Sequence, residues 1–264
     1  MEARVMRPEY LSGGNSHAMG TTLKASIPSP QIYANIGGVL YLIVIACGIF
    51  GELFARGPLI VSGDAAATAN HIANSISLWR AGIASDIVMH MCDIGVMLVF
   101  YVLLSPVNRN IALFALLSNV VQTSVLVVNT LNLLLPAFLL GDAEYLKALP
   151  PEQLQALAYV SLRTHDQGFA FGLIFFGMTC IAQGYLIIRS GYLPKVLGMG
   201  MQLAGVSYLI NSFAQILFPE LAPRLLPVIL LPPFIAEISM ALWLLAKGVN
   251  LSKWHNRQNA IAGS

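Results

Sequence analysis

Six long apolar segments limit what this chain can fold into. Each is close to the roughly 20 residues that a helix needs to cross a hydrocarbon core. The 264 residues are 57% hydrophobic and 10% charged, whereas a soluble domain carries about 25% charged residues. We therefore predict an all-α integral membrane bundle of six transmembrane helices. The expected spans are 34–55, 85–104, 110–140, 167–188, 194–218 and 225–246.

Polar segments flank these spans at both ends. Residues 1–31 are rich in Gly, Ser and Pro and lack an apolar stretch followed by a small-residue cleavage site. We expect a disordered polar tail there and no cleaved signal peptide. Residues 32–250 then form the six-span transmembrane domain, and residues 251–264 form a polar C-terminal tail.

The distribution of Lys and Arg predicts the orientation, because cytoplasmic loops are enriched in these residues. Placing the N-terminus in the cytoplasm puts nine basic residues inside and five outside. Six spans then place both termini in the cytoplasm. The net charge of +2 offers no basic surface for nucleic acid. We expect the lipid bilayer of the cell membrane as the main partner.

Two outer loops are expected to form short interfacial helices. In the first, residues 64–80, Asp64 is placed like an N-cap and Trp79 like an interfacial anchor. The second follows Pro150 and Pro151 and is amphipathic, so it is expected to run into the fourth span.

The second span, SDIVMHMCDIGVMLVFYVLL, carries a polar stripe. Asp86, His90 and Asp93 are spaced i, i+4 and i+7, so they lie on one face of a helix. A charge at the bilayer centre costs about 2.5–3.5 kcal/mol on insertion scales. Other helices or water must therefore cover this stripe.

All six spans place polar residues toward the outer leaflet, which predicts a polar, acid-lined pocket open to that side. Asp93 and Glu237 have no cation nearby in sequence, and such carboxylates are frequent in proton relays and acid/base sites. We expect them to exchange protons with a substrate, with Asp86 or His165 relaying protons to water. The residues expected to bind the substrate are Glu52, Asn129, Asn132, Asn211 and Gln215.

Simpler structural roles exist for most of these residues. Glu52 is spaced to pair with Arg56 one turn on, and Asp86 with Arg80. The Asn and Gln side chains can join helices through hydrogen bonds. His165 and Asp166 can mark a hydrated helix start.

The same residues include possible metal ligands. Asp86, His90 and Asp93, with His165 and Asp166, offer donors that suit zinc, manganese or iron, but no HExxH or repeated His pair supports them. No Gly-rich phosphate loop or GxSxG elbow occurs in the sequence. We therefore expect no metal and no cofactor. The three Cys residues lie in apolar runs and are expected in the core rather than in disulfides.

Several sequence runs resemble a known family: GVLYLIVIACGIFGELFARG, GDAAATANHI, GLIFFG, GYLIIRSGYLPKVLG, LAGVSYLI and EISMALWLLAKGVN. Together they resemble the membrane proteins grouped as domain of unknown function 4386, over about residues 32–250. The resemblance implies a six-span protein of the prokaryotic inner membrane and no established activity. A short internal echo also exists, between GVLYLI at 38–43 and GVSYLI at 205–210.

Three classes of function fit these observations. The first is an intramembrane acid/base enzyme that acts on a lipid-soluble substrate such as an isoprenoid, acyl or ether lipid. The second is a proton-coupled carrier of a small solute. The internal echo favours a carrier, whereas the small number of polar residues in the cytoplasmic halves of the spans disfavours it, because a carrier needs access from both faces. The third is an assembly or structural protein without turnover.

Overall fold

A computed structural model describes residues 29–262, and within that range it contains helices and no strands. Of the tail predicted at 1–31, residues 1–28 lie outside the described residues, whereas Pro30 and Gln31 already belong to the first helix. Six helical segments are long and apolar enough to cross a membrane, which confirms the predicted class. The elements are α1 (Pro30–Ile49), the π-helix η1 (Phe50–Arg56), α2 (Ala65–Asn74), α3 (Ile76–Leu104), α4 (Arg109–Asn129), α5 (Leu131–Leu139), η2 (Glu144–Ala148), α6 (Pro151–Ser190), α7 (Lys195–Leu217), α8 (Ala222–Leu225), η3 (Val228–Leu230), α9 (Leu231–Ala246) and α10 (Leu251–Ala262).

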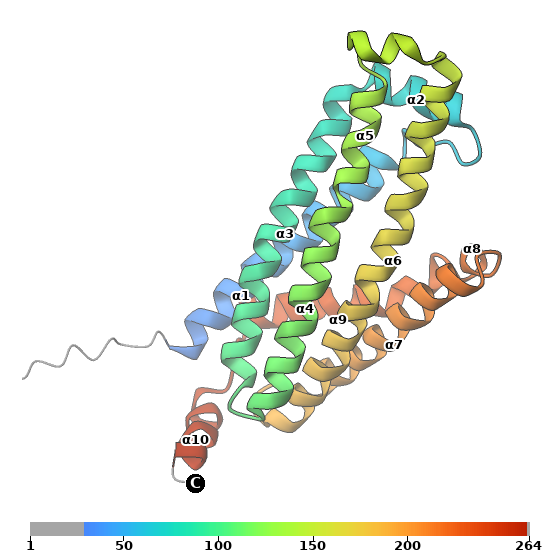
Figure 1. The fold of residues 1–264 in the computed structure, drawn as a ribbon. Helices are drawn as coiled ribbons and strands as arrows, with labels where there is room; N and C mark the ends of the chain where they lie inside the picture. The colour runs from blue at the N-terminus through green and yellow to red at the C-terminus, as the bar shows by residue number, and fades with distance from the viewer. Residues whose placement is uncertain (1–28, 263–264) are drawn as a thin grey trace, which may run out of the picture.

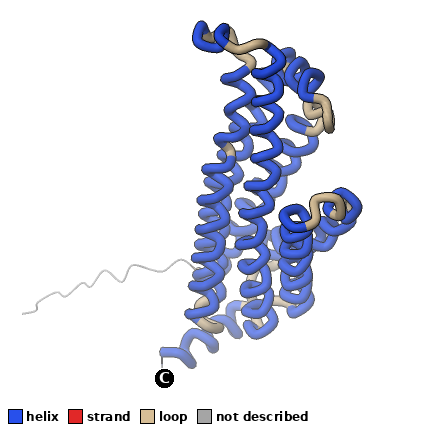
Figure 2. The backbone as a smooth tube through the Cα atoms, turned by 45° about the vertical axis from the view of Figure 1, so that its right-hand side comes forward, coloured by secondary structure: helices blue, strands red, loops and turns tan. Residues whose placement is uncertain are grey.

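The six long helices close into a ring of neighbours. Each helix contacts the next in the order α1, α3, α4, α6, α7, α9, and α9 contacts α1 again. Figures 1 and 2 show α3, α4, α5 and α6 as one elongated group, with α1, α7 and α9 packed against part of its length. The main core lies inside this ring and includes the fully buried Leu103, Leu186, Met201, Met240 and Leu244.

The closest helix pair, α6 with α7, is packed through glycines. A Cβ at Gly184 would lie 2.5 Å from the carbonyl oxygen of Gly198, and one at Gly205 would lie 2.5 Å from that of Gly177. Small residues are typical of membrane helix interfaces because they let two backbones approach without side chains between them. The α6–α7 hairpin is therefore held by backbone contact.

One end of the bundle forms a structure of its own, which we call the distal subassembly. It consists of α2, α5 and the first halves of α3 and α6, which gather at one end in Figure 1. Its separate apolar core is made by Leu59, Ile72, Trp79, Ile83, Leu133 and Leu162.

The 40 residues of α6 measure about 60 Å at 1.5 Å per residue, twice the thickness of a hydrocarbon core. The loop helix after Pro150 therefore does run into the fourth span, as predicted. Asp64 caps α2 by accepting a hydrogen bond from the amide of Ala67 at 2.8 Å, which also agrees with the prediction.

Trp79 differs from its prediction as an interfacial anchor. Its side chain is 1% exposed, and its Nε1 donates a 2.8 Å hydrogen bond to the carbonyl of Leu133. The second span begins at Ile76 rather than Ser85, so Trp79 lies inside a packed helix rather than in a loop. The apolar stretch at 85–104 predicted the membrane crossing alone, whereas α3 begins about two turns earlier, in the distal subassembly.

The remaining boundaries also follow from local chemistry. The third span breaks at Thr130 between α4 and α5, and the prolines split the sixth into α8, η3 and α9, as expected for residues that cannot continue a helix. The predicted polar C-terminal tail instead contains the helix α10. Cys180 is fully buried, as predicted, while Cys47 and Cys92 are half-buried, and all three are free.

Candidate functional site

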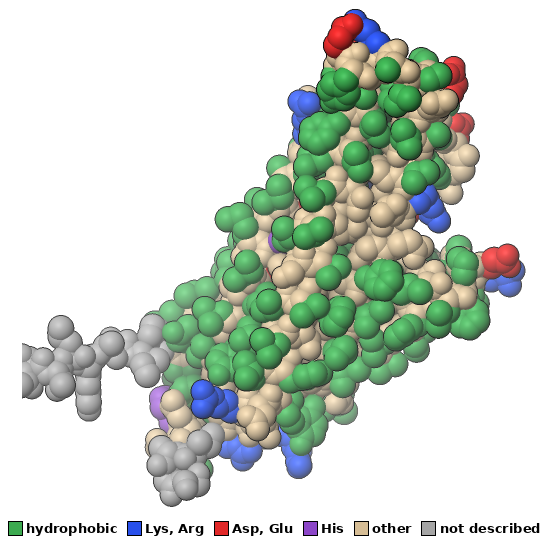
Figure 3. Space-filling model, viewed as in Figure 1, with side chains coloured by type: hydrophobic (Ala, Val, Ile, Leu, Met, Phe, Trp, Pro, Cys, Tyr) green, Lys and Arg blue, Asp and Glu red, His purple; other side chains and the backbone are tan. Residues whose placement is uncertain are grey.

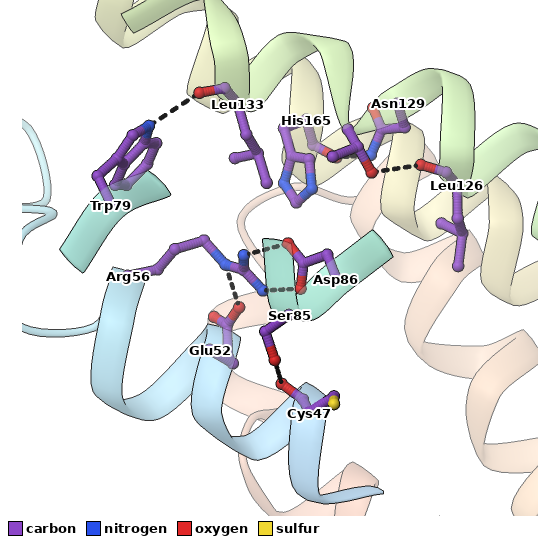
Figure 4. Close-up of polar contacts among 11 residues, drawn as sticks. Cys47, Glu52, Arg56, Trp79, Ser85, Asp86, Leu126, Asn129, Leu133 and His165 are labelled. Atoms are coloured by element: carbon purple, nitrogen blue, oxygen red, sulfur yellow. Dashed lines mark hydrogen bonds and ion pairs between the residues drawn. The ribbon is translucent and has the colours of Figure 1, made fainter. Parts of the chain in front are cut away.

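A buried ion pair joins the first span to the second. Arg56, at the end of η1, donates to both carboxylate oxygens of Asp86 on α3, at 2.6 and 3.3 Å. Its Nε donates to Glu52 at 3.0 Å, so one guanidinium holds two carboxylates (Figure 4). Arg56 is 9% exposed and Asp86 is 4% exposed, whereas the side chain of Glu52 is largely exposed. Asp86 therefore pairs with Arg56 and not with Arg80.

The local backbone explains why Arg56 reaches this position. Residues 50–56 form a π-helix, and the amide of Gly57 bonds the carbonyl of Glu52 five residues back, at 2.8 Å. Gly51 faces the ion pair, and a Cβ there would lie 2.7 Å from the Asp86 carboxylate. π-helices are rare and are frequent at functional sites. This one sits at the buried ion pair.

His165 faces this ion pair from α6. Its ring points toward Arg56 and Asp86 in Figure 4, and its backbone carbonyl accepts a 2.9 Å hydrogen bond from Asn129 Nδ2. Asn132 donates to Asn129 at 3.0 Å, which extends the chain of polar contacts along α5. His165 lies in the middle of α6 and not at a helix start, because that helix begins at Pro151.

Asp93 lies two turns from Asp86 on the same helix and has a different environment. Its Oδ2 accepts hydrogen bonds from Thr123 Oγ1 at 2.6 Å and Asn119 Nδ2 at 2.9 Å, both from α4. All three residues are buried, and both donors are neutral. His90 lies between the two aspartates on α3 and is 6% exposed. The Asp86–His90–Asp93 stripe is thus buried along its length, as the spacing predicted.

Glu237 on α9 lies beside two tyrosines from two other helices. Tyr208 on α7 donates a hydrogen bond to Glu237 Oε1, and the buried Tyr41 on α1 lies near the same carboxylate. These are the tyrosines of the repeated runs GVLYLI and GVSYLI. Gly38 of the first run packs against the α9 backbone, where a Cβ would lie 2.6 Å from the Leu245 amide. Two copies of one short pattern therefore meet at one acid.

The two remaining predicted residues lie on α7. Asn211 is 2% exposed, and its Oδ1 has no hydrogen-bond partner among the described residues. It lies one turn beyond Tyr208 on the same helix. Gln215 lies one further turn along and is half-buried.

The structure therefore distributes the predicted site over three polar groups. The first joins Glu52, Arg56 and Asp86, with His165 facing them; the second is centred on Asp93 and the third on Glu237. Asp93 and Glu237 are each hydrogen-bonded to side chains of other helices. A groove of about 460 Å³ between α4, α6 and α7 is lined by none of these acids; its residues are Ile111, Phe114, Met178, Ile181, Ala182, Tyr185 and Gln202.

The donor set does not form a metal centre in the described part of the chain. No three His, Cys, Asp or Glu side chains within residues 29–262 lie close enough to hold one ion. The carboxylate of Asp86 is engaged by Arg56, and that of Asp93 by Thr123 and Asn119.

Sequence reasoning missed the residues that hold the acids. Arg56 was considered a partner of Glu52 alone, although it also closes the pair with Asp86. Asn119 and Thr123 are spaced i, i+4 on α4, a pattern that marks one polar face in an apolar span. The signal for the two tyrosines was the internal echo, since both of its copies carry Tyr at the fourth position.

The comparison with known families agrees with this architecture. The sequence model described as "Domain of unknown function (DUF4386)" matches residues 36–248. The chain belongs to the DUF4386 family. This DUF4386 protein is 27% identical over 161 residues to an uncharacterised protein of Archaeoglobus fulgidus, a match that covers 61% of this chain and 80% of that protein. No solved structure matches this DUF4386 protein.

Proposed function

We propose that this protein is a proton-coupled carrier of a small solute, in which Asp93 and Glu237 exchange the coupling proton. One observation carries the proposal: each buried carboxylate bonds side chains of a different helix. Asp93 links α3 to α4, and Glu237 links α9 to α7. The protonation state of each acid then controls contacts between helices.

The chemistry of the partners supports proton exchange at these two acids. Thr123, Asn119 and Tyr208 are neutral donors, so they stabilise a carboxylate without cancelling its charge. An isolated charge in the hydrocarbon region is costly, and a carboxyl group avoids that cost by taking up a proton. Protonation removes the charge that these donors stabilise, so it weakens the hydrogen bonds to the neighbouring helix.

The row of titratable side chains on α3 supports a route for protons. Asp86 lies beside the partly exposed Glu52–Arg56 group, His90 follows one turn on, and Asp93 follows three residues later. The spacing places the three side chains on one face, about 10 Å from end to end along the helix. We propose that protons enter near Glu52 and reach Asp93 through Asp86 and His90, with His165 contributing from α6.

A carrier fits these observations better than an enzyme on a lipid-soluble substrate. Carriers are often built from repeated halves that meet at a central site. The approach of Tyr41 and Tyr208, from corresponding positions of the echo, to the same carboxylate is an arrangement of that kind.

The test is a pH jump applied to the full-length protein in liposomes on a solid-supported membrane. Proton binding to buried acids displaces charge across the bilayer and gives a transient current without any solute. We expect the wild-type protein to give this transient, and Asp93→Asn and Glu237→Gln each to lose at least about half of it. Equal transients in all three proteins would exclude these acids as the coupling groups.

A matched control separates buried from exposed acids. Glu144 is an exposed carboxylate in η2 whose partner is the exposed Lys147. Glu144→Gln removes the same charge as Glu237→Gln and should leave the transient unchanged. If Glu144→Gln reduced the current as much as the buried variants, the current would report surface charge and the proposal would fail.

A further inference from the structure

We propose that the α10 end of the bundle binds the headgroups of anionic phospholipids through a basic surface on α10 and the adjoining turns. This inference is independent of the proposed carrier function. It rests on the separation of charge between the two ends of the molecule, on the fixed position of α10, and on the exposure of the cations there.

Among the described residues, the α10 end of the bundle carries basic side chains and no acidic ones. Six exposed cations lie at the α10 end, and no Asp or Glu lies with them in the segments 98–112, 183–200 and 244–262. The opposite end carries both signs and includes the ion pairs Arg163–Asp166 and Lys147–Glu144. Figure 3 shows the same contrast, with Lys and Arg and no Asp or Glu on the visible face of that end. The six cations are Arg109, Arg189, Lys195, Lys247, Lys253 and Arg257.

The helix α10 is fixed to the bundle and does not extend freely from it. Trp254 is 6% exposed, and its Nε1 donates to the carbonyl of Leu103 at 3.3 Å. Asn250 caps the helix by accepting from the amide of Lys253 at 3.1 Å. Its own amide donates to the carbonyl of Tyr192 in the α6–α7 turn, at 3.1 Å.

Tyr192 secures the same junction from the other side. Its hydroxyl donates to the Leu103 carbonyl at 2.5 Å, so two side chains satisfy one carbonyl near the C-terminus of α3. Burial raises the pKa of this hydroxyl, which keeps it a donor at neutral pH. Because Trp254 fixes the rotation of α10, the exposed side chains of Lys253 and Arg257, one helical turn apart, lie together along one flank of this helix.

Anionic lipid headgroups are the partner that this surface fits. Four of the cations lie where the transmembrane helices α4, α6, α7 and α9 begin or end, which is the level of the phosphate groups in a bilayer. Near an anionic surface each Lys or Arg adds about 1 kcal/mol, or about fivefold in affinity. Two exposed cations one turn apart on a fixed helix can approach one phosphate together.

The experiment uses the full-length protein in neutral detergent micelles that contain fluorescent phosphatidylglycerol or fluorescent phosphatidylcholine. We expect tighter binding of phosphatidylglycerol, weakened by salt because exposed charges are screened. The double variant Lys253→Gln/Arg257→Gln should lose about 25-fold of that affinity, at about fivefold per charge. Equal binding of the two lipids by the wild-type protein would overturn the inference.

Three controls make the outcome decisive. Lys147→Gln/Arg163→Gln removes two cations from the opposite end and should bind phosphatidylglycerol like the wild type; an equal loss there would overturn the inference. Lys253→Arg/Arg257→Lys changes the same two side chains and keeps both charges, so it should keep the binding. Loss of binding in this variant would contradict a site based on charge. Inorganic phosphate should compete only weakly with the lipid. Competition as strong as that of the lipid itself would assign the surface to a free anion and overturn the inference.

Discussion

Arg56 and Asp86 form a two-point ion pair between the first and second spans, with N–O distances of 2.6 and 3.3 Å. Neither residue can leave this pair cheaply. Both are buried, so removing Arg56 leaves Asp86 as an uncompensated charge, and removing Asp86 leaves Arg56 with only the exposed Glu52. The pair joins the end of the π-helix η1 to α3, at the first residue of the stripe formed by Asp86, His90 and Asp93.

The first prediction concerns that pair. Arg56→Met should destabilise the protein by about 3–5 kcal/mol, because Asp86 remains as a single buried charge. Asp86→Leu should cost less, because Glu52 still pairs with Arg56. The double variant Arg56→Met/Asp86→Leu should recover a large part of the loss, since neither charge is left. Reversible unfolding in detergent measures all three free energies.

An exposed ion pair supplies the control. Arg163 and Asp166 are 3.1 Å apart on α6 and both are largely exposed. Arg163→Met should cost less than about 1 kcal/mol, as exposed pairs usually do. Single variants of the buried pair that behaved like this control would show that Arg56 and Asp86 are not paired in the folded protein.

The second prediction concerns Gly168 on α6, which faces the side-chain amide of Asn129. A Cβ at Gly168 would overlap that amide, so Gly168→Ala must displace Asn129 from the carbonyl of His165. We expect Gly168→Ala to lower stability by about 1–3 kcal/mol, and Asn129→Ala in the same chain to add little further loss. Thermal unfolding of the two single variants and the double variant measures this coupling.

Gly48, another helical glycine, supplies the control for Gly168→Ala. A Cβ at Gly48 would make only an ordinary 3.4 Å contact with Met89. Gly48→Ala should be neutral or slightly stabilising, because Ala favours a helix over Gly. If Gly168→Ala were equally harmless, the close approach of α6 to Asn129 would be wrong.

The third prediction concerns the distal subassembly. Trp79→Phe keeps most of the buried area and removes the hydrogen bond to the Leu133 carbonyl, so it should cost about 1 kcal/mol. Trp79→Ala should cost about 3–5 kcal/mol and expose residues 141–150 to protease. Protease digestion that attacked wild type and Trp79→Ala equally would show that Trp79 does not hold this end together.

The fourth prediction concerns the two tyrosines at Glu237. Tyr41→Phe and Tyr208→Phe should each alter the rate of the pH-jump transient, because each removes a donor from the same acid. The effects should be non-additive, since the two hydroxyls share one carboxylate. Strictly additive effects in the double variant would indicate that the tyrosines act at separate places.

The fold could be predicted from sequence because spans are set by length and hydrophobicity, which are local properties. The stripe of Asp86, His90 and Asp93 was also predictable, since helical spacing places them on one face. The partners were not, because Thr123 and Tyr208 reach their acids across helix pairs that no local pattern specifies. The burial of Trp79 likewise depends on α5, which lies more than 50 residues away in sequence.

The central claim is that Asp93 and Glu237 each hold an exchangeable proton inside the bundle. pH-difference infrared spectroscopy of the protein in lipid measures this directly through the carbonyl stretching bands of protonated carboxyl groups. The account predicts two such bands in the wild type, one absent from Asp93→Asn and the other from Glu237→Gln, with both kept in Glu144→Gln. Identical difference spectra from the wild type and both buried variants would contradict it.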